Sequence, residues 1–558
     1  REATSTRAAA TGSSHGSAGA TTAATVAGMG IPAHDYHERT KHSVTDLRGG
    51  QPLEWADKPL PYKRYTNVPP LPLPLSWPEP EVPAGVALSS EVIARTRQLG
   101  LPDLARLLFL SAGVTRRHSN GHTTTFFRAA PSAGALYPVE LYMVCGGLPE
   151  LPAGVYHFEP VEFALRRLRS GDLRASLALA AANSEIAEHL VTIVLTGIPW
   201  RTTWKYGARG YRHLFWDAGT ILANTIAAAA SAGLLARVLV GFVDAEVTHF
   251  LGLDNPSQEF AEYPLAIVPL SLPALARPPG PPARPGPEPP PATELPALEL
   301  DVAQLSRQQV DEPELHAVHA AGTLDSPAAV SLWRRSVRER GSPSAAGKVR
   351  APSEAAGTVD EVILRRGSTR RFTRTSVPAA TLSWGIAAAS RGLHADFLAQ
   401  GETLLIRFLA VQAVDDLESG VYRWNSDGLQ LFRRGLFRAE VSRVCLDQRL
   451  GGDAAFTLFE CAELDALLRA AGTRAYRAAQ LEAGIVAGWL QLVAFAHGVG
   501  GTGLTFYDDE VRAFLDTSAE PMLTVAVGVP GYDATPGKRP SELPPWRLER
   551  WGWGEPWS

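Results

Sequence analysis

The stretch "ARGYRHLFWDAG", residues Ala208–Gly219, recurs as "TRAYRAAQLEAG" at Thr473–Gly484. A tyrosine, an acidic residue and a glycine keep their places in both copies, at a constant spacing of 265 residues. Two further blocks match in the same order along both halves. Downstream, "GFVDAEVTHFL" matches "TFYDDEVRAFL", and upstream, "GVYHF" matches "GVYRW". Chance does not place so many matches in one order. The sequence therefore predicts a tandem duplication whose halves pack like the two subunits of a pseudo-symmetric dimer.

The composition is that of an ordinary soluble globular protein. Of 558 residues, 45% are hydrophobic and 20% charged, and this length predicts about three to four segments. A net charge of −4 provides no electrostatic footprint for nucleic acid or for an anionic membrane surface. Cys145, Cys445 and Cys461 show no metal spacing, and the first and last are expected to be buried. These features favour a reducing, cytoplasmic location.

Two segments need to be checked as targeting or membrane elements. The N-terminal residues lack the apolar core of a secretory signal, so residues 1–35 are expected to form a disordered tail. Ala218–Ala236 is uncharged, but alanine dominates it and polar residues such as Asn224 interrupt it. This segment predicts a buried core helix rather than a membrane span.

The order of helical and strand-like runs predicts an α+β fold. The strand-like runs of the first globular region are "VELYMVCGG", "GVYHFEP", "VTIVLTGIP" and "YPLAIVPL", and helical runs are mixed among them. One helix, "SPAAVSLWRRSVRER", is expected in a charged connector, and the Trp-rich tail is expected to pack against its own domain. The predicted segments are an extended Pro-rich segment (36–88), a first domain (89–272), a Pro-rich linker (273–297), the connector (298–357), a second domain (358–540) and the tail (541–558).

The first half contains a turn of small residues, "RAAPSAGALYP" (Arg128–Pro138), between a polar run and a strand-like run. Small residues from Ser132 to Ala135 let a backbone approach a flat ligand, which bulky side chains prevent. Arg128 stands just ahead of them, with a planar five-donor head that suits a phosphate or a polar ring edge. Taken alone, these residues also fit an ordinary Ser/Gly turn.

The second half opens with "RRGSTRRF" (Arg365–Phe372), an Arg-x-Ser-x-Arg pattern at Arg366, Ser368 and Arg370. Alternate residues of an extended segment project to the same side, so two guanidinium groups and a hydroxyl can converge on one phosphate. The first half has no comparable start, and the second half has no "APSAGALYP". Two pieces that are useless alone predict one composite site between the halves.

Two other patterns do not indicate a binding site, one for a dinucleotide and one for a metal. "GVGGTG" (Gly498–Gly503) satisfies Gly-x-Gly-x-x-Gly, but the dinucleotide motif needs a strand before it and a helix after it, and here the expected order is reversed. The 14 histidines show no ligand spacing, so no metal site is expected. "HERTKH" (His37–His42) is expected to be a packing or partner element.

The motifs together resemble the FMN-dependent nitroreductase superfamily, and more specifically its SagB-type azoline dehydrogenases of ribosomal peptide pathways. The residues that carry the resemblance are "YHERTKH", "RAAPSAGALYPVELY", "GVYHF", "WKYGARGYRHLFWDAG" and "RRGSTRRF". It covers most of residues 36–540, apart from the linker and the connector. It implies two nitroreductase-like α+β sandwich domains packed as a pseudo-dimer, with FMN at their interface.

The resemblance also implies site residues. The phosphate end of FMN is expected to contact Arg366, Ser368 and Arg370, with Lys538 and Arg539 as weaker additions. The flavin ring is expected to lie along Pro131, Ser132, Ala133 and Gly134, with Arg128 as a further contact. Because each half retains a different piece, we expect one working FMN site per chain and one degenerate site.

Family members remove a proton with a Lys–Tyr pair, which maps to Lys205 and Tyr206. Aromatising an azoline requires loss of a hydride to the flavin and loss of a proton, and a lysine desolvated beside a flavin can act as the base. A surface lysine and a packed tyrosine are the plain alternatives for these residues. The second half reads "LLRAAG" at this place and lacks the pair. Tyr211 and Asp217 recur in both halves and are assigned to structure.

Three functions remain open at this point. The first is an FMN-dependent oxidoreductase that dehydrogenates azoline rings in a ribosomally made peptide, with a cyclodehydratase complex as a partner. The second is an NAD(P)H-dependent flavin reductase or desaturase of a small molecule. The third is a non-catalytic scaffold of a peptide-modifying complex, which the complementary halves of one site disfavour. No nucleic-acid or membrane partner is expected, and oligomerisation beyond the pseudo-dimer stays open.

Overall fold

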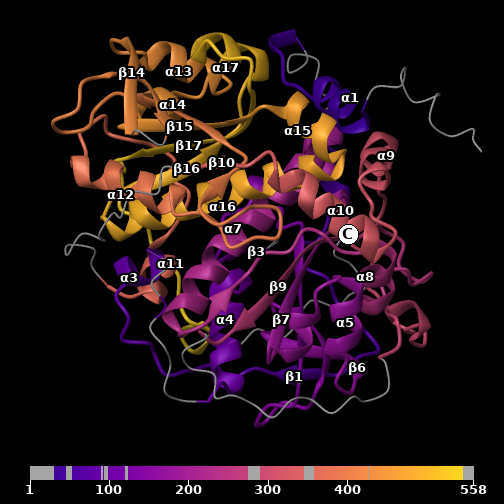
Figure 1. The fold of residues 1–558 in the computed structure, drawn as a ribbon. Helices are drawn as coiled ribbons and strands as arrows, with labels where there is room; N and C mark the ends of the chain where they lie inside the picture. Colours follow the sequence, from indigo (N-terminus) through magenta and orange to yellow (C-terminus); the bar gives the residue numbers. More distant parts are fainter. Residues whose placement is uncertain are drawn as a thin grey trace, which may run out of the picture.

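Two halves of similar architecture stack on each other in the computed structural model, which describes residues 31–45, 53–89, 92, 98–119, 124–273, 289–344, 357–425 and 428–543. In Figure 1 the sheet and most helices of the first half (purple to magenta) lie below and the second half (orange to yellow) lies above, while the indigo helix α1 (Pro32–Arg39) lies at the top beside α15 (Leu464–Ala471). Two long helices, α7 (Gly210–Ser231) and α16 (Arg474–Ala496), run between them. Each half combines an antiparallel sheet with helices, which confirms the predicted α+β class.

The first half is built on a seven-stranded antiparallel sheet in the order β1-β6-β5-β4-β7-β9-β8. Its strands are β1 (Pro70–Pro72), β4 (Val139–Cys145), β5 (Gly154–Glu159), β6 (Ala164–Ser170), β7 (Val191–Gly197), β8 (Leu235–Ala236) and β9 (Tyr263–Ser271). A hairpin of β2 (Val114–Ser119) and β3 (Thr124–Arg128) stands apart from this sheet. The helices besides α7 are α1 (Pro32–Arg39), α3 (Ala84–Leu88), α4 (Leu101–Ala112), α5 (Arg174–Ala180), α6 (Trp200–Tyr206) and α8 (Asp244–Leu251), with short 3-10 turns η1 (Trp55–Asp57), η2 (Ala133–Ala135), η3 (Ser184–Glu188) and η4 (Gly207–Arg209). The four strands predicted from apolar runs are β4, β5, β7 and β9.

The second half repeats this sheet in the order β14-β13-β12-β15-β17-β16, which is the first order without its edge strand β1. Its strands are β12 (Ile406–Val411), β13 (Gly420–Asn425), β14 (Gly428–Arg434), β15 (Phe456–Ala462), β16 (Gly500–Leu504) and β17 (Glu520–Gly528). Its helices besides α16 are α11 (Val359–Arg365), α12 (Ala379–Ser390), α13 (Arg438–Val444), α14 (Arg449–Asp453), α15 (Leu464–Ala471) and α17 (Asp508–Leu515), followed by η7 (Pro540–Glu542). "GVGGTG" thus follows a helix and begins a strand, as expected.

The long helices cross where two glycines meet. A Cβ atom on Gly219 of α7 would lie 2.5 Å from backbone atoms of Gly484 of α16. Because these residues are equivalent in the two repeats, the pseudo-twofold axis passes close to their contact. One hydrophobic core includes residues of both long helices and of both sheets, so the halves fold around shared apolar contacts.

Matching buried ion pairs tie each half to the other. In each half, two arginines at the start of the long helix donate to one aspartate of the opposite half. These pairs are Arg209 and Arg212 with Asp508, at 2.9 and 2.8 Å, and Arg474 and Arg477 with Asp244, at 2.5 and 3.0 Å. Reciprocal exchange of equivalent contacts is the geometry of a twofold dimer, here within one chain.

Helix α1 covers this interface, close to the pseudo-twofold axis. The Tyr36 ring packs edge-on against Tyr211 and Tyr476, with centroids 5.7 and 5.9 Å away. Arg212 donates to the carbonyl oxygen of His37 at 2.8 Å. The segment "YHERTKH" therefore has a packing role, and α1 begins at Pro32, inside the predicted tail of residues 1–35.

Three groups near α1 lie close enough to hold a cation: His37, Glu38 and Glu520. The amine of Lys41 is 2.8 Å from the Glu38 carboxylate and 3.2 Å from that of Glu520. This amine supplies the positive charge that these carboxylates need, so the cluster is explained without an ion.

The connector contributes a second copy of α1. Helix α9 (Pro313–Ala321) places the carbonyl of His319 on Arg477, and the His319 ring 3.2 Å from the hydroxyl of Tyr211. These are the contacts of α1 with the equivalent residues exchanged. The second repeat therefore begins inside the predicted connector of residues 298–357. The connector holds two helices rather than one, because α10 (Pro327–Arg338) follows α9, and its strand β10 (Ser342–Pro343) pairs with β11 (Glu402–Thr403).

Both long helices are core elements. All of α7 except Ile226 is buried, which confirms the expectation for Ala218–Ala236 as far as the helix extends. Among the described residues, α16 is the one helix long and apolar enough to cross a membrane, and 94% of its apolar window is buried inside the protein. All three cysteines are free and buried.

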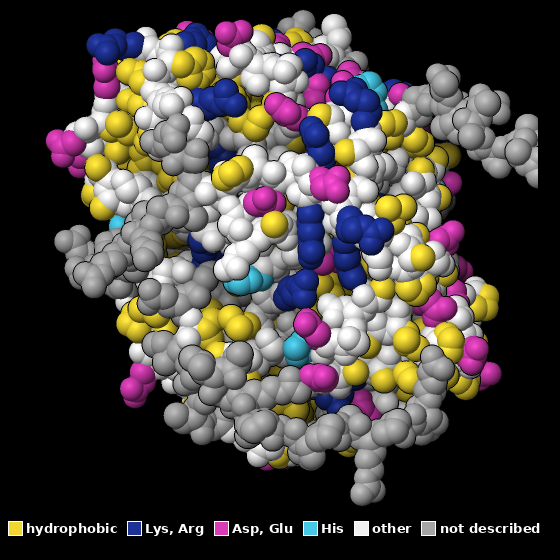
Figure 2. All heavy atoms as spheres, in the orientation of Figure 1, with side chains coloured by type: hydrophobic (Ala, Val, Ile, Leu, Met, Phe, Trp, Pro, Cys, Tyr) yellow, Lys and Arg dark blue, Asp and Glu magenta, His cyan; other side chains and the backbone are white. Residues whose placement is uncertain are grey.

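Other predicted segments are described only in part. Residues 1–30 of the tail, 274–288 of the linker and 544–558 at the Trp-rich end lie outside the described residues. The end of the linker contains the 3-10 turn η6 (Ala292–Glu294), and the Pro-rich segment contains α3. On the face drawn in Figure 2, basic and acidic side chains are interspersed, in line with a net charge near zero.

Candidate functional site

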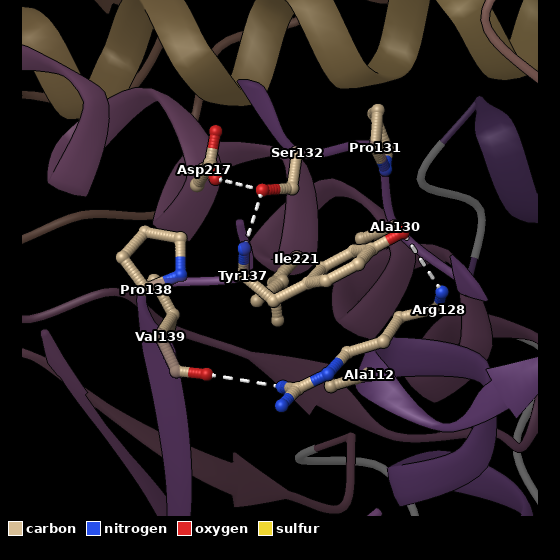
Figure 3. A pocket seen from close by; sticks show the side chains of 10 residues that line it. All are labelled: Ala112, Arg128, Ala130, Pro131, Ser132, Tyr137, Pro138, Val139, Asp217 and Ile221. Atoms are coloured by element: carbon tan, nitrogen blue, oxygen red, sulfur yellow. Dashed lines mark hydrogen bonds between the residues drawn. The ribbon is translucent and has the colours of Figure 1, made fainter. Parts of the chain in front are cut away.

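The small-residue turn of the first half is held by helix α7. The carboxylate of Asp217 accepts hydrogen bonds from the hydroxyl of Ser132 and, at 3.1 Å, from the amide of Ala133. The same hydroxyl accepts from the amide of Tyr137 at 2.8 Å, and Thr220 donates to the carbonyl of Pro131 at 2.8 Å. Figure 3 shows Asp217, Ser132 and Tyr137 joined in this way. Helix α7, which lies between the two halves, therefore fixes the conformation of the turn.

The backbone of the turn is strained where it meets α6. Gly134, Ala135 and Tyr137 have φ angles of 63°, 54° and 48°, a region that residues other than glycine rarely adopt. A Cβ atom on Gly134 would lie 3.0 Å from the hydroxyl of Tyr206 and 3.3 Å from the amine of Lys205. The predicted pair thus converges on the predicted turn. Lys205 is exposed and Tyr206 is half-buried.

Basic side chains from both halves lie near this turn. Arg366 is buried, its Nε donates to the carbonyl of Ala129 at 3.1 Å, and its Nη1 has no partner in the described part of the chain. Arg116 of the hairpin donates to the carbonyls of Arg366 and Thr535, at 2.8 and 2.7 Å. Within the described residues no ion pair joins Arg116, Arg366 or Arg370 to a carboxylate. Guanidinium groups that pair with no carboxylate in the described part of the chain are suited to bind an anion.

The other predicted residues are placed as follows. Ser368 is half-buried in the same segment, between the two arginines, and Lys538 is exposed beside the hairpin, with its amide on the carbonyl of Thr115 at 2.8 Å. Arg539 is turned toward Glu79, with which it forms an ion pair. Arg128 is buried, and its guanidinium donates to the carbonyls of Pro61 and Val139. The structure thus gives Arg128 and Arg539 protein partners, whereas it brings Arg366 and Arg370 toward the turn.

Burial shifts the pKa values of the titratable groups around the turn. Burial raises the pKa of Asp217 to about 7, against the two hydrogen bonds that it accepts. Burial and the Asp217 carboxylate raise the pKa of Tyr206, and the guanidinium of Arg370 opposes this shift. Burial, together with the charges of Arg116 and Arg370, lowers the pKa of Arg366 to about 10. The Tyr206 phenol is therefore protonated at neutral pH, and the Arg366 guanidinium is charged.

The equivalent place in the second half keeps the acidic residue that holds the turn but lacks the Lys–Tyr pair. Glu482 accepts from the hydroxyl of Thr403 and, at 3.0 Å, from the amide of Leu404, as Asp217 does in the first half. The positions of Lys205 and Tyr206 are taken by Ala470 and Ala471.

Large side chains and the connector also fill this second place. Trp489 stands where the first half has Asn224, and the guanidinium of Arg391 stacks on its ring at 3.8 Å. Residue Ser344 of the connector donates its amide to the carbonyl of Gly401 at 2.7 Å, directly before β11. A small cavity remains here, lined by Ser344, Thr403, Glu482 and Trp489 among others.

The nitroreductase family model matches residues 101–270 and 363–529, once in each half. The chain belongs to the nitroreductase family. Proteins of this family are flavin-dependent oxidoreductases, and the predicted superfamily and tandem fold are thereby confirmed.

Relatives support this assignment. A protein of Methanocaldococcus jannaschii named as a nitroreductase, MJ1384, is 31% identical over 173 residues, which are 31% of this chain and 80% of that protein. The microcin B17-processing protein McbC of Escherichia coli is 30% identical over 134 residues, 23% of this chain and 49% of McbC, so the match spans about half of that relative. A crystal structure from Anabaena variabilis, also named as a nitroreductase, superposes with a TM-score of 0.67 at 25% identity and covers 90% of this chain and 99% of its own. Because the superposition covers nearly the whole length of both chains, the Anabaena variabilis protein shares the tandem fold of this chain.

The residues of the site fit a flavin with a phosphate. The unpartnered Nη1 of Arg366 and the surrounding guanidinium groups suit the anionic end, and the small-residue turn brings its backbone close to Lys205 and Tyr206. Arg116 was not found from the sequence, because it lies in a polar run whose hairpin structure no apolar alternation indicates.

Proposed function

We propose that this chain is an FMN-dependent oxidoreductase that converts azoline rings to azoles in a ribosomally made peptide. The observation that carries the proposal is the convergence of Lys205 and Tyr206 on Gly134, near Arg366 of the opposite half, whose Nη1 has no partner among the described residues. Arg366, Arg370 and Ser368 would hold the phosphate of FMN, and Pro131–Gly134 would line its ring. Arg116 would add a fourth contact at the phosphate end.

The roles of the two catalytic residues follow from their surroundings. When bound, the flavin supplies the acceptor for the electron pair of one ring C–H bond. Lys205 takes the proton from the neighbouring ring carbon, so that the ring gains one double bond and loses two hydrogens. Tyr206 stays protonated, because burial raises its pKa, and it acts as a hydrogen-bond donor that orients the ring.

The substrate class rests on a relative. McbC is named for processing microcin B17, a peptide, and the half of McbC that this chain matches supports a peptide substrate here. A cyclodehydratase that makes the azoline is then the expected partner, because an azoline must exist before it can be oxidised.

The test uses a synthetic peptide that contains one thiazoline, with the FMN-loaded protein, and follows the loss of two hydrogens by mass spectrometry. Lys205→Ala is expected to keep its flavin and to lower the rate about a hundredfold or more, because it removes the base. Lys205→Arg is the matched control: its long side chain is similar in size, but its guanidinium stays protonated and cannot act as a base, so it is expected to be equally slow.

Other outcomes separate the alternatives. A Lys205→Ala protein that oxidises the peptide at the wild-type rate contradicts the role of Lys205. Rapid bleaching of the flavin by NAD(P)H, without azole formation, would favour the reductase that acts on a small molecule. A wild-type protein that takes up no FMN would favour the scaffold.

A further inference from the structure

A histidine that the proposed chemistry does not use lies flat against Tyr206. The rings of His213, from α7, and Tyr206, from the end of α6, stack with their centroids 4.1 Å apart and their planes 14° from parallel. Trp216 also packs edge-on against the histidine, with the ring centroids 4.6 Å apart. His213 thus contacts both Trp216 of its own helix and the phenol that meets Gly134.

The burial of His213 is unfavourable by itself. Its side chain is 4% exposed, and neither ring nitrogen has a hydrogen-bond partner in the part of the chain that the structure describes. Burial, reinforced by the charge of Arg209, holds the pKa of His213 well below its ordinary value, so the ring is neutral at physiological pH. A buried imidazole with two unpaired nitrogens costs stability compared with an apolar ring of the same size. Among the described residues, His213 therefore contributes the face of its ring to its surroundings and no side-chain hydrogen bond.

The tandem repeat supplies a comparison within the same molecule. At the repeat spacing of 265 residues, His213 corresponds to Ala478 and Tyr206 to Ala471. Both alanines lie in regular helices of the second half, α16 and α15. The fold therefore does not need the stacked pair. The pair is present together, beside Lys205, in the half that keeps the site and absent together in the other half.

We infer that His213 is a positioning residue for Tyr206, which it holds with the phenol hydroxyl directed at the Gly134 turn. The inference rests on the proposed function for the role of Tyr206, but the geometry can be tested without it. A flat neutral ring restricts rotation of the tyrosine side chain and adds no charge beside it. Tyr206 thereby remains a protonated donor of fixed direction.

The first test measures the stack itself. The full chain is labelled with 3-fluorotyrosine, and the Tyr206 resonance is assigned by its disappearance in Tyr206→Phe. Loss of the neighbouring ring in His213→Ala is expected to move this resonance and broaden it, whereas His213→Phe should keep it near its wild-type position. The control Thr225→Ala also truncates a buried side chain of α7, and Thr225 bonds to Ser111 and Ile221 rather than to Tyr206. It should leave the resonance in place.

The second test measures turnover of the FMN-loaded protein in a double-mutant cycle. His213→Ala is expected to lower kcat about tenfold to a hundredfold with little change in KM, since misplacement of a catalytic group has effects of this size. In the Tyr206→Phe background the same substitution should have almost no further effect, because residues that act through one another are not additive. Thr225→Ala should act equally in both backgrounds, and His213→Phe should restore most of kcat.

The outcomes separate this inference from the proposed function. An unchanged fluorine resonance in His213→Ala, or equal effects of His213→Ala with and without the Tyr206 hydroxyl, would overturn the positioning role. A wild-type protein that does not oxidise azolines contradicts the proposed function, and the fluorine spectrum would still decide whether His213 orients Tyr206.

Discussion

Asp217 shows at the level of one residue how the interface builds the site. Its carboxylate lies on the long helix α7 and holds the turn at Ser132 and Ala133 through two hydrogen bonds. The recurrence of an acidic residue at Glu482 predicts a structural role, and the structure agrees, because Glu482 holds Thr403 and Leu404 in the same way. The sequence could not show that this structural residue anchors the turn that carries the proposed flavin contacts.

Asp217 also makes stability depend on pH. Its pKa is raised from about 3.9 in an unfolded chain to about 7 in the fold, because burial disfavours its charge. Between these values the folded protein binds a proton that the unfolded chain has lost, so the free energy of unfolding falls as the pH rises from about 4 to 7. Asp217→Asn has no such proton to lose. Its stability relative to the wild type should therefore increase over this range.

Urea unfolding at several pH values between about 4.5 and 6.5 measures this difference, because the range lies between the two pKa values. Asp325→Asn is the control, because Asp325 is exposed and its substitution should leave the pH dependence of the wild type unchanged. A stability difference between Asp217→Asn and the wild type that stays constant over the range would contradict a raised pKa.

Elements show which parts of the fold the sequence could predict. Strands β4, β5, β7 and β9 are visible as apolar runs because they are buried on both faces. The hairpin β2–β3 was not predicted, since polar residues such as His118 and Thr124 fill it. Helix α9 was also missed. It resembles α1 in its contacts, which it makes with Arg477 and Tyr211, and not in its amino-acid sequence. Arg116 and His213 act through tertiary contacts of this kind, which no local pattern contains.

The close crossing of α7 and α16 predicts that a side chain at Gly219 will destabilise the fold. Gly219→Ala would place a methyl group 2.5 Å from the backbone of Gly484, and backbone atoms cannot move aside cheaply. We expect a loss of about 1–3 kcal/mol in the free energy of unfolding, which is the usual cost of overpacking. Gly147→Ala is the control, since a Cβ at that exposed glycine has no neighbour within 4 Å. Equal stability of the two variants would contradict the close crossing.

The whole molecule is a dimer made within one chain, and its halves have diverged. The first half supplies the turn, Lys205 and Tyr206, and the second supplies Arg366 and Arg370. At the opposite place the pair is replaced by two alanines, and Trp489 and Arg391 stack in the interior. This divergence is what we expect if the duplication left one of two equivalent sites at work and released the other from its task.

The measurement that tests this account most directly is the amount of FMN per chain, from acid release and quantitation of flavin in the purified protein after loading with excess FMN. The account predicts one FMN per chain in the wild type, and a clear loss of bound FMN in Arg366→Gln, which removes a buried guanidinium from the phosphate end. Two FMN per chain would contradict the closure of the second place, and none would contradict the composite site itself.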